Sequence, residues 1–361
     1  MKRLAIISIY AVMSIFLSAV CTDYDKYDNG SQPQTNVYIA GDIDNGDNFT
    51  AVLWKNGKPT TFPDYSSVID IAVSENDVYL LGGTNSVYCY WKMEQPQTPT
   101  LLEGGNGHAI AVSSNGDVYV GGEQRAGDND PLLPCYWKNG QKVSLSVDYP
   151  YELRGGEVED IAISGDNVYI VGGLFGSSNE LHSSAVYWKN GQQITLAHNQ
   201  GYPSSIAVSG NDVYVCNGGS DGSGIIEEDG NAFAVYWENG RQITLTQHRD
   251  GYDDYIPSGI AVYGSDVYVC GYFFRPMIYN YSGSGSGSTT GETVRWKAVY
   301  WKNGQLITLA QNAVATGIAV HGNDVYVCGY MYSGSGTLAV YWKNGKQVVL
   351  GQGVANAIVI K

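Results

Sequence analysis

A repeat of two short sequence elements, present seven times, constrains the fold of this chain more than any other feature. The first element reads Ile-Ala-Val-Ser-Gly-Asn-Asp-Val-Tyr and the second Ala-Val-Tyr-Trp-Lys-Asn-Gly, with variation between copies. The tyrosine closing the first element recurs every 40 to 58 residues, at Tyr38, Tyr79, Tyr119, Tyr169, Tyr214, Tyr268 and Tyr326. The tryptophan of the second element recurs at Trp54, Trp91, Trp137, Trp188, Trp237, Trp301 and Trp342. A period of this length indicates a repeating all-β unit of several short strands.

The pattern within one copy predicts four strands. In the fifth copy we expect strands at 206–208, 212–216, 234–237 and 242–245. Asn239-Gly240 separates the last two strands, and Asn-Gly is typical of a type I′ hairpin turn. Apolar residues continue on both faces of the second and third strands, which indicates a sheet covered by neighbours on both sides.

The two ends of the chain hold complementary parts of one copy. Residues 36–41 begin at a second strand, and Ala357-Ile358-Val359-Ile360 forms a first strand at the other end. Pairing the two completes a ring and removes its exposed sheet edges. The sequence therefore predicts an all-β protein with a single seven-bladed β-propeller at 36–361. Its blades are four-stranded, and the C-terminal strand closes the ring by pairing with the N-terminal one.

The Trp-Lys-Asn-Gly hairpin repeat resembles the β-propeller repeats of secreted bacterial proteins, and the resemblance covers residues 36–361. The copies lack the Gly-His and Trp-Asp marks of WD40 repeats, and their paired glycines are irregular for kelch repeats. Such a resemblance implies a fold and no particular activity.

The N-terminus has the pattern of a targeting segment. A basic Met1-Lys2-Arg3 precedes an uncharged apolar run that ends at Val20, which is typical of a signal peptide at 1–20. The stretch Ser18-Ala19-Val20-Cys21 resembles a bacterial lipobox, although Ser18 stands where leucine is usual and Val20 where glycine or alanine is usual. The resemblance implies lipidation of Cys21. An ordinary secretory signal and an uncleaved anchor are the alternatives.

Residues 21–35 are polar, without apolar periodicity, and we expect them to form a lipidated flexible tether. Acidic residues directly after the cysteine resemble the export signals of surface lipoproteins in some Gram-negative bacteria. We therefore expect a lipid-anchored protein at the outer membrane or cell surface, with a location facing the periplasm as the alternative.

Charge excludes two classes of partner. The chain has 35 Asp+Glu against 20 Lys+Arg, a net charge of −15. Nucleic acids and anionic lipid surfaces require a basic footprint, so we expect no nucleic-acid partner and no membrane contact beyond the lipid anchor. Nearly all the net negative charge falls in the loops that join strands two to three and four to one. These loops vary in length and lie on one face of a propeller, where function usually resides.

Aromatic residues outside the repeat gather in the same loops. Tyrosine with aspartate suits stacking on sugars or an adaptable protein-binding surface. The best cluster combines loops of the fifth and sixth copies: Tyr252, Asp253, Asp254, Tyr255, Phe274, Arg275, Tyr279, Tyr281 and Trp296. We expect a non-catalytic, monomeric binding module whose partner is a glycan or an envelope protein. The alternative is that these side chains pack the long loops onto the ring.

Catalytic and metal-binding signals are sparse. No nucleophile elbow or phosphate-loop lysine is present. A propeller glycosidase or polysaccharide lyase with carboxylates on the loop face is one alternative function, and a purely structural role in envelope assembly is another. We expect no cofactor. Asp42, Asp44 and Asp47 resemble a calcium loop in composition but miss the order of an EF-hand, and turn formation explains them equally.

Overall fold

The computed structural model describes residues 35–46, 48–74, 77–84, 87–125, 127, 130–150, 152–176, 183–198, 202–219, 232–248, 254–275, 279–280, 288–289, 295–334 and 336–361. Residues 35–361 form one compact unit. The predicted signal peptide, Cys21 and all of the tether before Thr35 lie outside the described residues. Within the described residues, no helix is long and apolar enough to cross a membrane.

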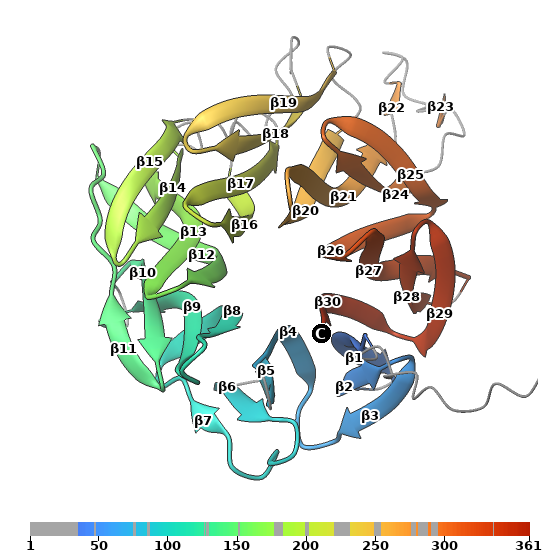
Figure 1. Cartoon of the computed structure of the whole chain (residues 1–361), viewed down its shortest axis with the longest axis horizontal. Coiled ribbons are helices and arrows are strands. Elements are labelled where there is room, and N and C mark those ends of the chain that lie inside the picture. The colour runs from blue at the N-terminus through green and yellow to red at the C-terminus, as the bar shows by residue number, and fades with distance from the viewer. Residues whose placement is uncertain are drawn as a thin grey trace, which may run out of the picture. The chain divides into compact units, whose positions relative to one another are not determined.

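Seven four-stranded antiparallel sheets surround one centre, which confirms the predicted seven-bladed propeller (Figure 1). The first blade contains β30 (Val354–Ile360), β1 (Val37–Asp44), β2 (Phe49–Lys55) and β3 (Lys58–Phe62). The second contains β4 (Ser67–Val73), β5 (Val78–Thr84), β6 (Val87–Lys92) and β7 (Thr100–Leu101). The third contains β8 (Gly105–Val112), β9 (Val118–Arg125), β10 (Leu132–Lys138) and β11 (Gln141–Ser144).

The remaining four blades follow in chain order. The fourth contains β12 (Leu153–Ser164), β13 (Asn167–Gly176), β14 (Ser183–Lys189) and β15 (Gln192–His198). The fifth contains β16 (Tyr202–Ser209), β17 (Asp212–Gly219), β18 (Ala232–Glu238) and β19 (Arg241–His248). The sixth contains β20 (Asp254–Tyr263), β21 (Asp266–Arg275), β24 (Arg295–Lys302) and β25 (Gln305–Gln311). The seventh contains β26 (Ala313–His321), β27 (Asp324–Ser333), β28 (Gly336–Lys343) and β29 (Lys346–Gln352). A separate two-stranded sheet pairs β22 (Tyr279–Asn280) with β23 (Ser288–Thr289).

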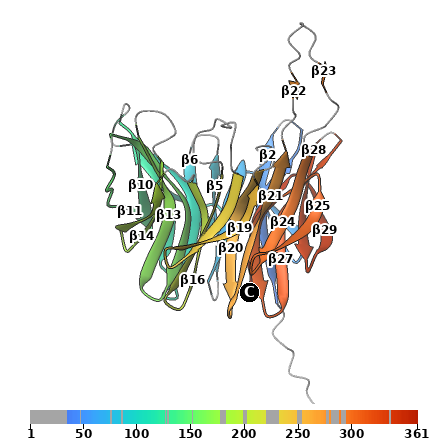
Figure 2. The ribbon, with the colours of Figure 1, turned by 90° about the horizontal axis from the view of Figure 1, so that it is seen from above.

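The ring closes in the predicted way. The C-terminal β30 pairs antiparallel with the N-terminal β1, with Ile358 opposite Ile39. The backbones of Asn36 and Lys361 exchange hydrogen bonds of 2.6 and 2.9 Å at the end of this ladder. The C-terminus therefore lies beside the first described residues, at one face of the ring (Figure 2).

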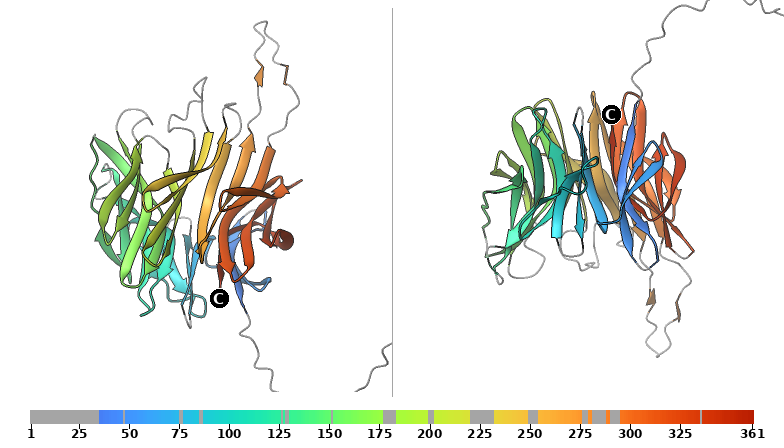
Figure 3. Two further views of the ribbon diagram at one scale, coloured as in Figure 1. Left: turned by 45° about the horizontal axis from the view of Figure 1, so that its top comes forward. Right: turned by 90° about the horizontal axis from the view of Figure 1, so that it is seen from below.

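The two faces of the ring carry different connections (Figures 2 and 3). We call the face with the loops between second and third and between fourth and first strands the long-loop face. The hairpin face carries the short turns, including the Asn-Gly pairs, and it is also where Asn36 and Lys361 meet. Anything attached before Thr35 therefore joins the ring at the hairpin face.

The repeated Asn-Gly pairs form the predicted type I′ turns. The six asparagines have φ of 51–52° and the following glycines φ of 78–81°, which is the left-handed geometry that this turn requires. In the sixth blade, Asn303 accepts a hydrogen bond from the Val267 amide at 2.9 Å and donates to Asp266 at 2.7 Å. Lys302 pairs with the same Asp266 at 2.8 Å. The Asp-Val-Tyr and Trp-Lys-Asn-Gly elements are thus parts of one structural network.

Packing between blades forms the core. Each of seven buried clusters combines side chains from two adjacent blades. The seven repeat tryptophans are the largest fully buried side chains. The five cysteines in the ring are buried and unpaired, and burial raises the pKa of each thiol. The repeat residues are therefore accounted for by the scaffold.

Candidate functional site

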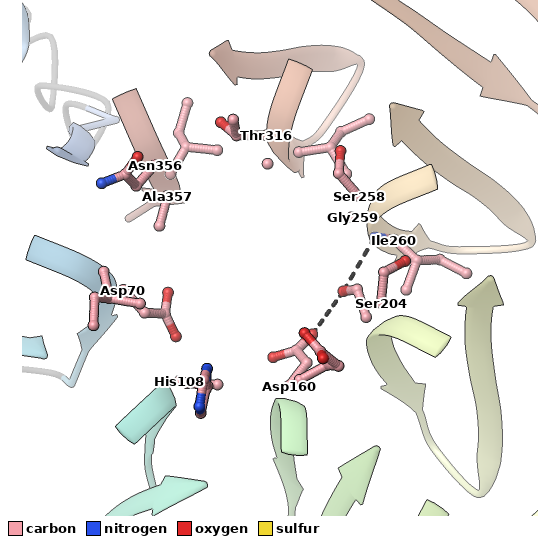
Figure 4. Close-up of a pocket in the computed structure, with 17 residues that line it drawn as sticks. Asp70, His108, Asp160, Ser204, Ser258, Gly259, Ile260, Thr316, Asn356 and Ala357 are labelled. Carbon is pink, nitrogen blue, oxygen red and sulfur yellow. Dashed lines mark hydrogen bonds between the residues drawn. The ribbon is translucent and has the colours of Figure 1, made fainter. Parts of the chain in front are cut away.

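The innermost strands surround a central channel with a cavity of about 260 Å³ (Figure 4). Each innermost strand has a β-bulge near its middle, as between Val158 and Asp160 in β12. The bulge places one unpaired residue of every blade toward the channel, because an extra residue there has no partner in the ladder. At Gly172 on the facing β13, a Cβ atom would lie 1.9 Å from the Glu157 carbonyl oxygen, so glycine is required opposite the bulge.

Bulge side chains link consecutive blades around the channel. Four of them donate a hydrogen bond to a carbonyl of the next blade: Ser204 to Pro257 (2.8 Å), Ser258 to Ala315 (2.7 Å), Thr316 to Ala355 (2.7 Å) and Asn356 to Val68 (2.7 Å). The Ser205 hydroxyl also accepts a hydrogen bond from the Ile260 amide of the next blade at 3.3 Å, drawn as a dashed line in Figure 4. These hydroxyls and amides serve the scaffold.

Asp70 forms a carboxylate bridge between the second and third blades. One oxygen accepts from the Ile71 amide and the other from the Ile110 amide of the next blade, each at 2.8 Å. Desolvation by burial, and after it the nearby Asp160, raise the pKa of Asp70 to about 7 against the opposing effect of the two amide hydrogen bonds.

Asp160 bridges the fourth and fifth blades in the same way. It accepts from the Ile161 amide at 2.7 Å, the Ser205 hydroxyl at 2.6 Å and the Ile206 amide at 2.9 Å. Burial raises the pKa of Asp160 as well. An alignment of the seven copies singles out both aspartates. Asp70 and Asp160 are the two acidic residues at a position that is small in the other blades, where it holds Ala109, Ser205, Gly259, Gly317 and Ala357.

We expect the protein to become more stable as the pH falls from 8 to 5. The folded pKa of Asp70 is about 7, whereas an unfolded aspartate titrates near 3.9, so the folded chain holds the extra proton in this interval. The stabilisation that this proton brings is lost as pH rises through the folded pKa. Urea midpoints at each pH measure the effect.

The variant Asp70→Asn should flatten this dependence between pH 6 and 8. Its overall stability should also fall, because the amide NH2 cannot accept from both Ile71 and Ile110. A wild-type urea midpoint that increases from pH 5 to pH 8 would contradict the assignment.

The junction between the third and fourth blades is built differently. The bulge residue His108 turns to its own blade, where its Nε2 lies 2.9 Å from Glu123 Oε1. Asn106 donates to the same oxygen at 3.0 Å. Glu123 is 3% exposed, and its Oε2 has no hydrogen-bond partner among the described residues. The hydrogen bond that His108 donates to the Glu123 carboxylate raises the pKa of His108 above its ordinary value.

A second candidate region is an aromatic cluster toward the long-loop end of the sixth and seventh blades. We call it the aromatic platform. Trp296 is at its centre, with ring centroids 4.4 Å from Phe274, 5.5 Å from Tyr272 and 5.7 Å from Tyr332. Tyr330 packs edge-on against Tyr332 at 5.6 Å. The Tyr332 side chain is exposed, at 42%, and the other four are half-buried.

The structure brings together Trp296 and Phe274 from the predicted binding residues. Tyr255 lies elsewhere, packed against Phe273 at 5.2 Å and Trp301 at 5.8 Å in the core between the fifth and sixth blades. For three predicted residues only the backbone is described: Asp254 begins β20, Arg275 ends β21 and Tyr279 begins β22. Tyr252, Asp253 and Tyr281 lie outside the described residues.

Tyr272, Tyr330 and Tyr332 were not in the predicted cluster, although they belong to the platform. Tyr272 and Tyr330 occupy the same repeat position, directly after the glycine of the second strand, in adjacent blades. Their shared repeat position in adjacent blades is the feature of the sequence from which the proximity of Tyr272 and Tyr330 could have been predicted.

The carboxylates of the calcium hypothesis have other partners. Asp42 accepts from the Val68 amide at 2.8 Å and from Asn356 at 3.2 Å, and burial raises its pKa to about 6. Asp44 accepts from the Gly46 amide at 2.8 Å, and Asp47 lies outside the described residues. In the described part of the chain, no group of three or more His, Cys, Asp and Glu residues could hold a metal ion.

Comparison with known proteins supports the fold and leaves the activity open. No protein-family model and no curated protein sequence matches the chain. Among solved structures, an acylaminoacyl peptidase from Pyrococcus horikoshii is similar over 88% of this chain and 50% of its own, with 12% identity and a TM-score of 0.51. TolB from Acinetobacter baumannii is similar over 90% of this chain and 66% of its own, with 12% identity and a TM-score of 0.45. A Trypanosoma rangeli sialidase covers 84% of this chain and 56% of its own, with 10% identity and a TM-score of 0.37.

The chain thus spans less than two thirds of each of these three solved chains. At such low identities the likeness shows a propeller fold and nothing of ligand or reaction.

Proposed function

We propose that this protein is a lipid-anchored binding module of the cell envelope that takes a glycan on its long-loop face. The observation that carries the proposal is the aromatic platform around Trp296. Four of its five rings are tyrosine or tryptophan, which combine an apolar face with a polar group that can hydrogen-bond a sugar hydroxyl. Such rings at a partly exposed surface suit stacking on a pyranose.

The position of the chain entry supports the same proposal. The ring begins at the hairpin face, where Asn36 pairs with Lys361. A lipid at Cys21 would be joined to the ring through the chain that enters at that face, so the long-loop face carries no chain entry. The outer leaflet of a Gram-negative outer membrane fits this arrangement, and monomeric rings suffice for it.

Two of the channel acids, Asp70 and Asp160, are poor candidates for glycoside chemistry because of their hydrogen bonds. Glycosidases need one carboxyl group that can donate a proton and a second that is free to attack or to activate water. Asp70 and Asp160 each have both oxygens engaged by backbone amides or a hydroxyl of the ring. These two side chains therefore serve the scaffold.

The double variant Trp296→Ala/Tyr332→Ala should weaken glycan binding at least tenfold, about 1.4 kcal/mol, with the melting temperature nearly unchanged. A glycan-array screen of the purified wild-type chain identifies the ligand, and isothermal titration measures the affinity of each variant. Tyr263→Ala is the matched control, because Tyr263 is 49% exposed at the end of β20, on the hairpin face.

Undiminished binding by the double variant would remove the platform from the proposal. A wild-type chain that binds no glycan but retains an envelope protein through Trp296 and Tyr332 would replace the glycan with a protein partner.

A further inference from the structure

One junction of the channel wall is not closed by side chains. At the other six junctions the innermost strands are joined by hydrogen bonds that bulge side chains donate or that Asp70 and Asp160 accept. Between β8 and β12, the described residues form no such bond, because His108 turns to Glu123 within its own blade. Glu159, the bulge residue of β12, makes no hydrogen bond to any described residue, so its carboxylate is available to a ligand.

Negative charge is concentrated at this junction. Glu157, Glu159 and Glu123 are near enough to His108 to affect its pKa, and Asp70 and Asp160 lie on either side of it in the wall (Figure 4). The opposite wall is formed by the neutral Ser204, Ser258, Thr316 and Asn356. The described residues that line the cavity include no lysine or arginine. Among the described residues of the lining, His108 is the one basic side chain.

Glu123 gives an independent sign of an incomplete site. Its side chain is 4% exposed and directed at His108, yet Oε2 has no partner among the described residues. A buried carboxylate oxygen without a donor costs free energy comparable to a lost hydrogen bond or more. Additional positive charge beside His108 would stabilise this carboxylate.

We propose that the central channel binds an organic cation with a primary ammonium group at the junction of the third and fourth blades, with the carboxylate of Glu159 as its ligand. An ammonium group has three donors and needs no compact coordination shell. A metal ion needs several ligands converging at short distances, and the described residues offer no such group. The ammonium could belong to a free diamine or to a lysine side chain of another protein.

Protonation should oppose this binding. Burial raises the pKa of Glu159, and the neighbouring Glu157 and Glu123 raise it further, while His108 opposes the shift. As pH falls, protonation of Glu159 removes an attractive charge and protonation of His108 adds a repulsive one. Asp70 and Asp160 also lose negative charge on protonation as pH falls, whereas the neutral side chains of the opposite wall do not titrate. Affinity should therefore be higher at pH 8 than at pH 5.

Isothermal titration of the full chain with 1,5-diaminopentane tests the proposal, with neutral 1,5-pentanediol as the matched probe. We expect diamine binding without diol binding, at least a tenfold loss in Glu159→Gln, and a change below twofold in Glu94→Gln. Glu94 is exposed at the hairpin-face end of β6, so this control removes the same charge outside the channel. A lysine-containing peptide with its N-acetylated lysine counterpart distinguishes a protein-borne ammonium from a free amine.

Equal binding of diol and diamine would overturn the proposal, as would unchanged affinity in Glu159→Gln. Stoichiometric displacement of the diamine by millimolar calcium would also overturn it, in favour of a metal site. If Glu159→Gln fails to fold, Glu159→Ser provides the same test, because the bulge of the next blade holds Ser204 at the equivalent position. The Trp296→Ala/Tyr332→Ala variant should bind the diamine normally, which separates this site from the proposed glycan platform.

Discussion

Replacing Trp188 with alanine should reduce the free energy of unfolding by about 3–5 kcal/mol, the range for removing a large buried aromatic side chain. Trp188 is 0% exposed and lies in the cluster shared by the third and fourth blades, with Val158 and Ile161. Its Nε1 donates to the Ser146 carbonyl at 2.7 Å, so the substitution also leaves that carbonyl without its donor. Urea unfolding followed by circular dichroism measures the loss.

Trp296→Ala is the control for the same chemical change at the aromatic platform. Trp296 is half-buried and contacts other partly exposed rings, so its loss should cost less than about 1.5 kcal/mol. The contrast separates a tryptophan that holds two blades together from one that is available to a ligand. Equal destabilisation by the two substitutions would mean that Trp296 is part of the scaffold, and the platform would lose its candidacy as a binding surface.

The fold could be predicted from the sequence because the same pattern of strands and turns recurs in each blade. Asn303 and Gly304 show why: the turn needs left-handed backbone at both positions, and Asn-Gly is the pair that accepts it most readily. The same Asn303 donates to Asp266 and accepts from the Val267 amide, and the six blades with an Asn-Gly turn link these two elements, distant in sequence, in this way. Local turn chemistry and long-range pairing therefore indicate the same architecture.

Sites between blades were predicted less well, because the sequence does not show which side of a strand faces which neighbour. Tyr255 and Phe274 are both aromatic residues at the long-loop end of one blade. Tyr255 packs on Trp301 toward the fifth blade, whereas Phe274 packs on Trp296 toward the seventh blade. A shift of one position along a strand reverses the face of the sheet, so composition alone cannot assign such residues to one patch.

The channel was missed for a related reason. The innermost strand β12 begins at Leu153, well before the apolar residues by which the repeat marks a first strand, and it carries Glu159 into the channel wall. The bulge beside Asp160 changes which residues point inward, and a bulge leaves no residue signature of its own in a single copy. Negative charge that counts toward the loop face in the sequence is therefore partly charge of the channel.

Deleting residues 354–361 should abolish cooperative folding. This deletion removes β30, which supplies the innermost strand of the first blade and buries Ala355 and Ile358. It also removes Asn356, whose bond to the Val68 carbonyl joins the first and second blades. The loss should exceed about 5 kcal/mol, the lower bound for the stability of a natural domain. Thermal melts followed by circular dichroism measure it.

A circular permutant provides the control, because it moves the ends of the chain without removing a strand. In the seventh blade His321 and Asp324 pair across a Gly322-Asn323 turn, and Lys361 and Asn36 form the equivalent pair in the first blade. A Gly-Asn linker between Lys361 and Asn36 should therefore close the chain without strain. New ends between Gly264 and Ser265, in the corresponding turn of the sixth blade, should leave the melting temperature within about 5 °C, since ends in exposed turns are well tolerated. Cooperative melting of the truncated chain at the wild-type temperature would show that the ring does not depend on pairing between β1 and β30.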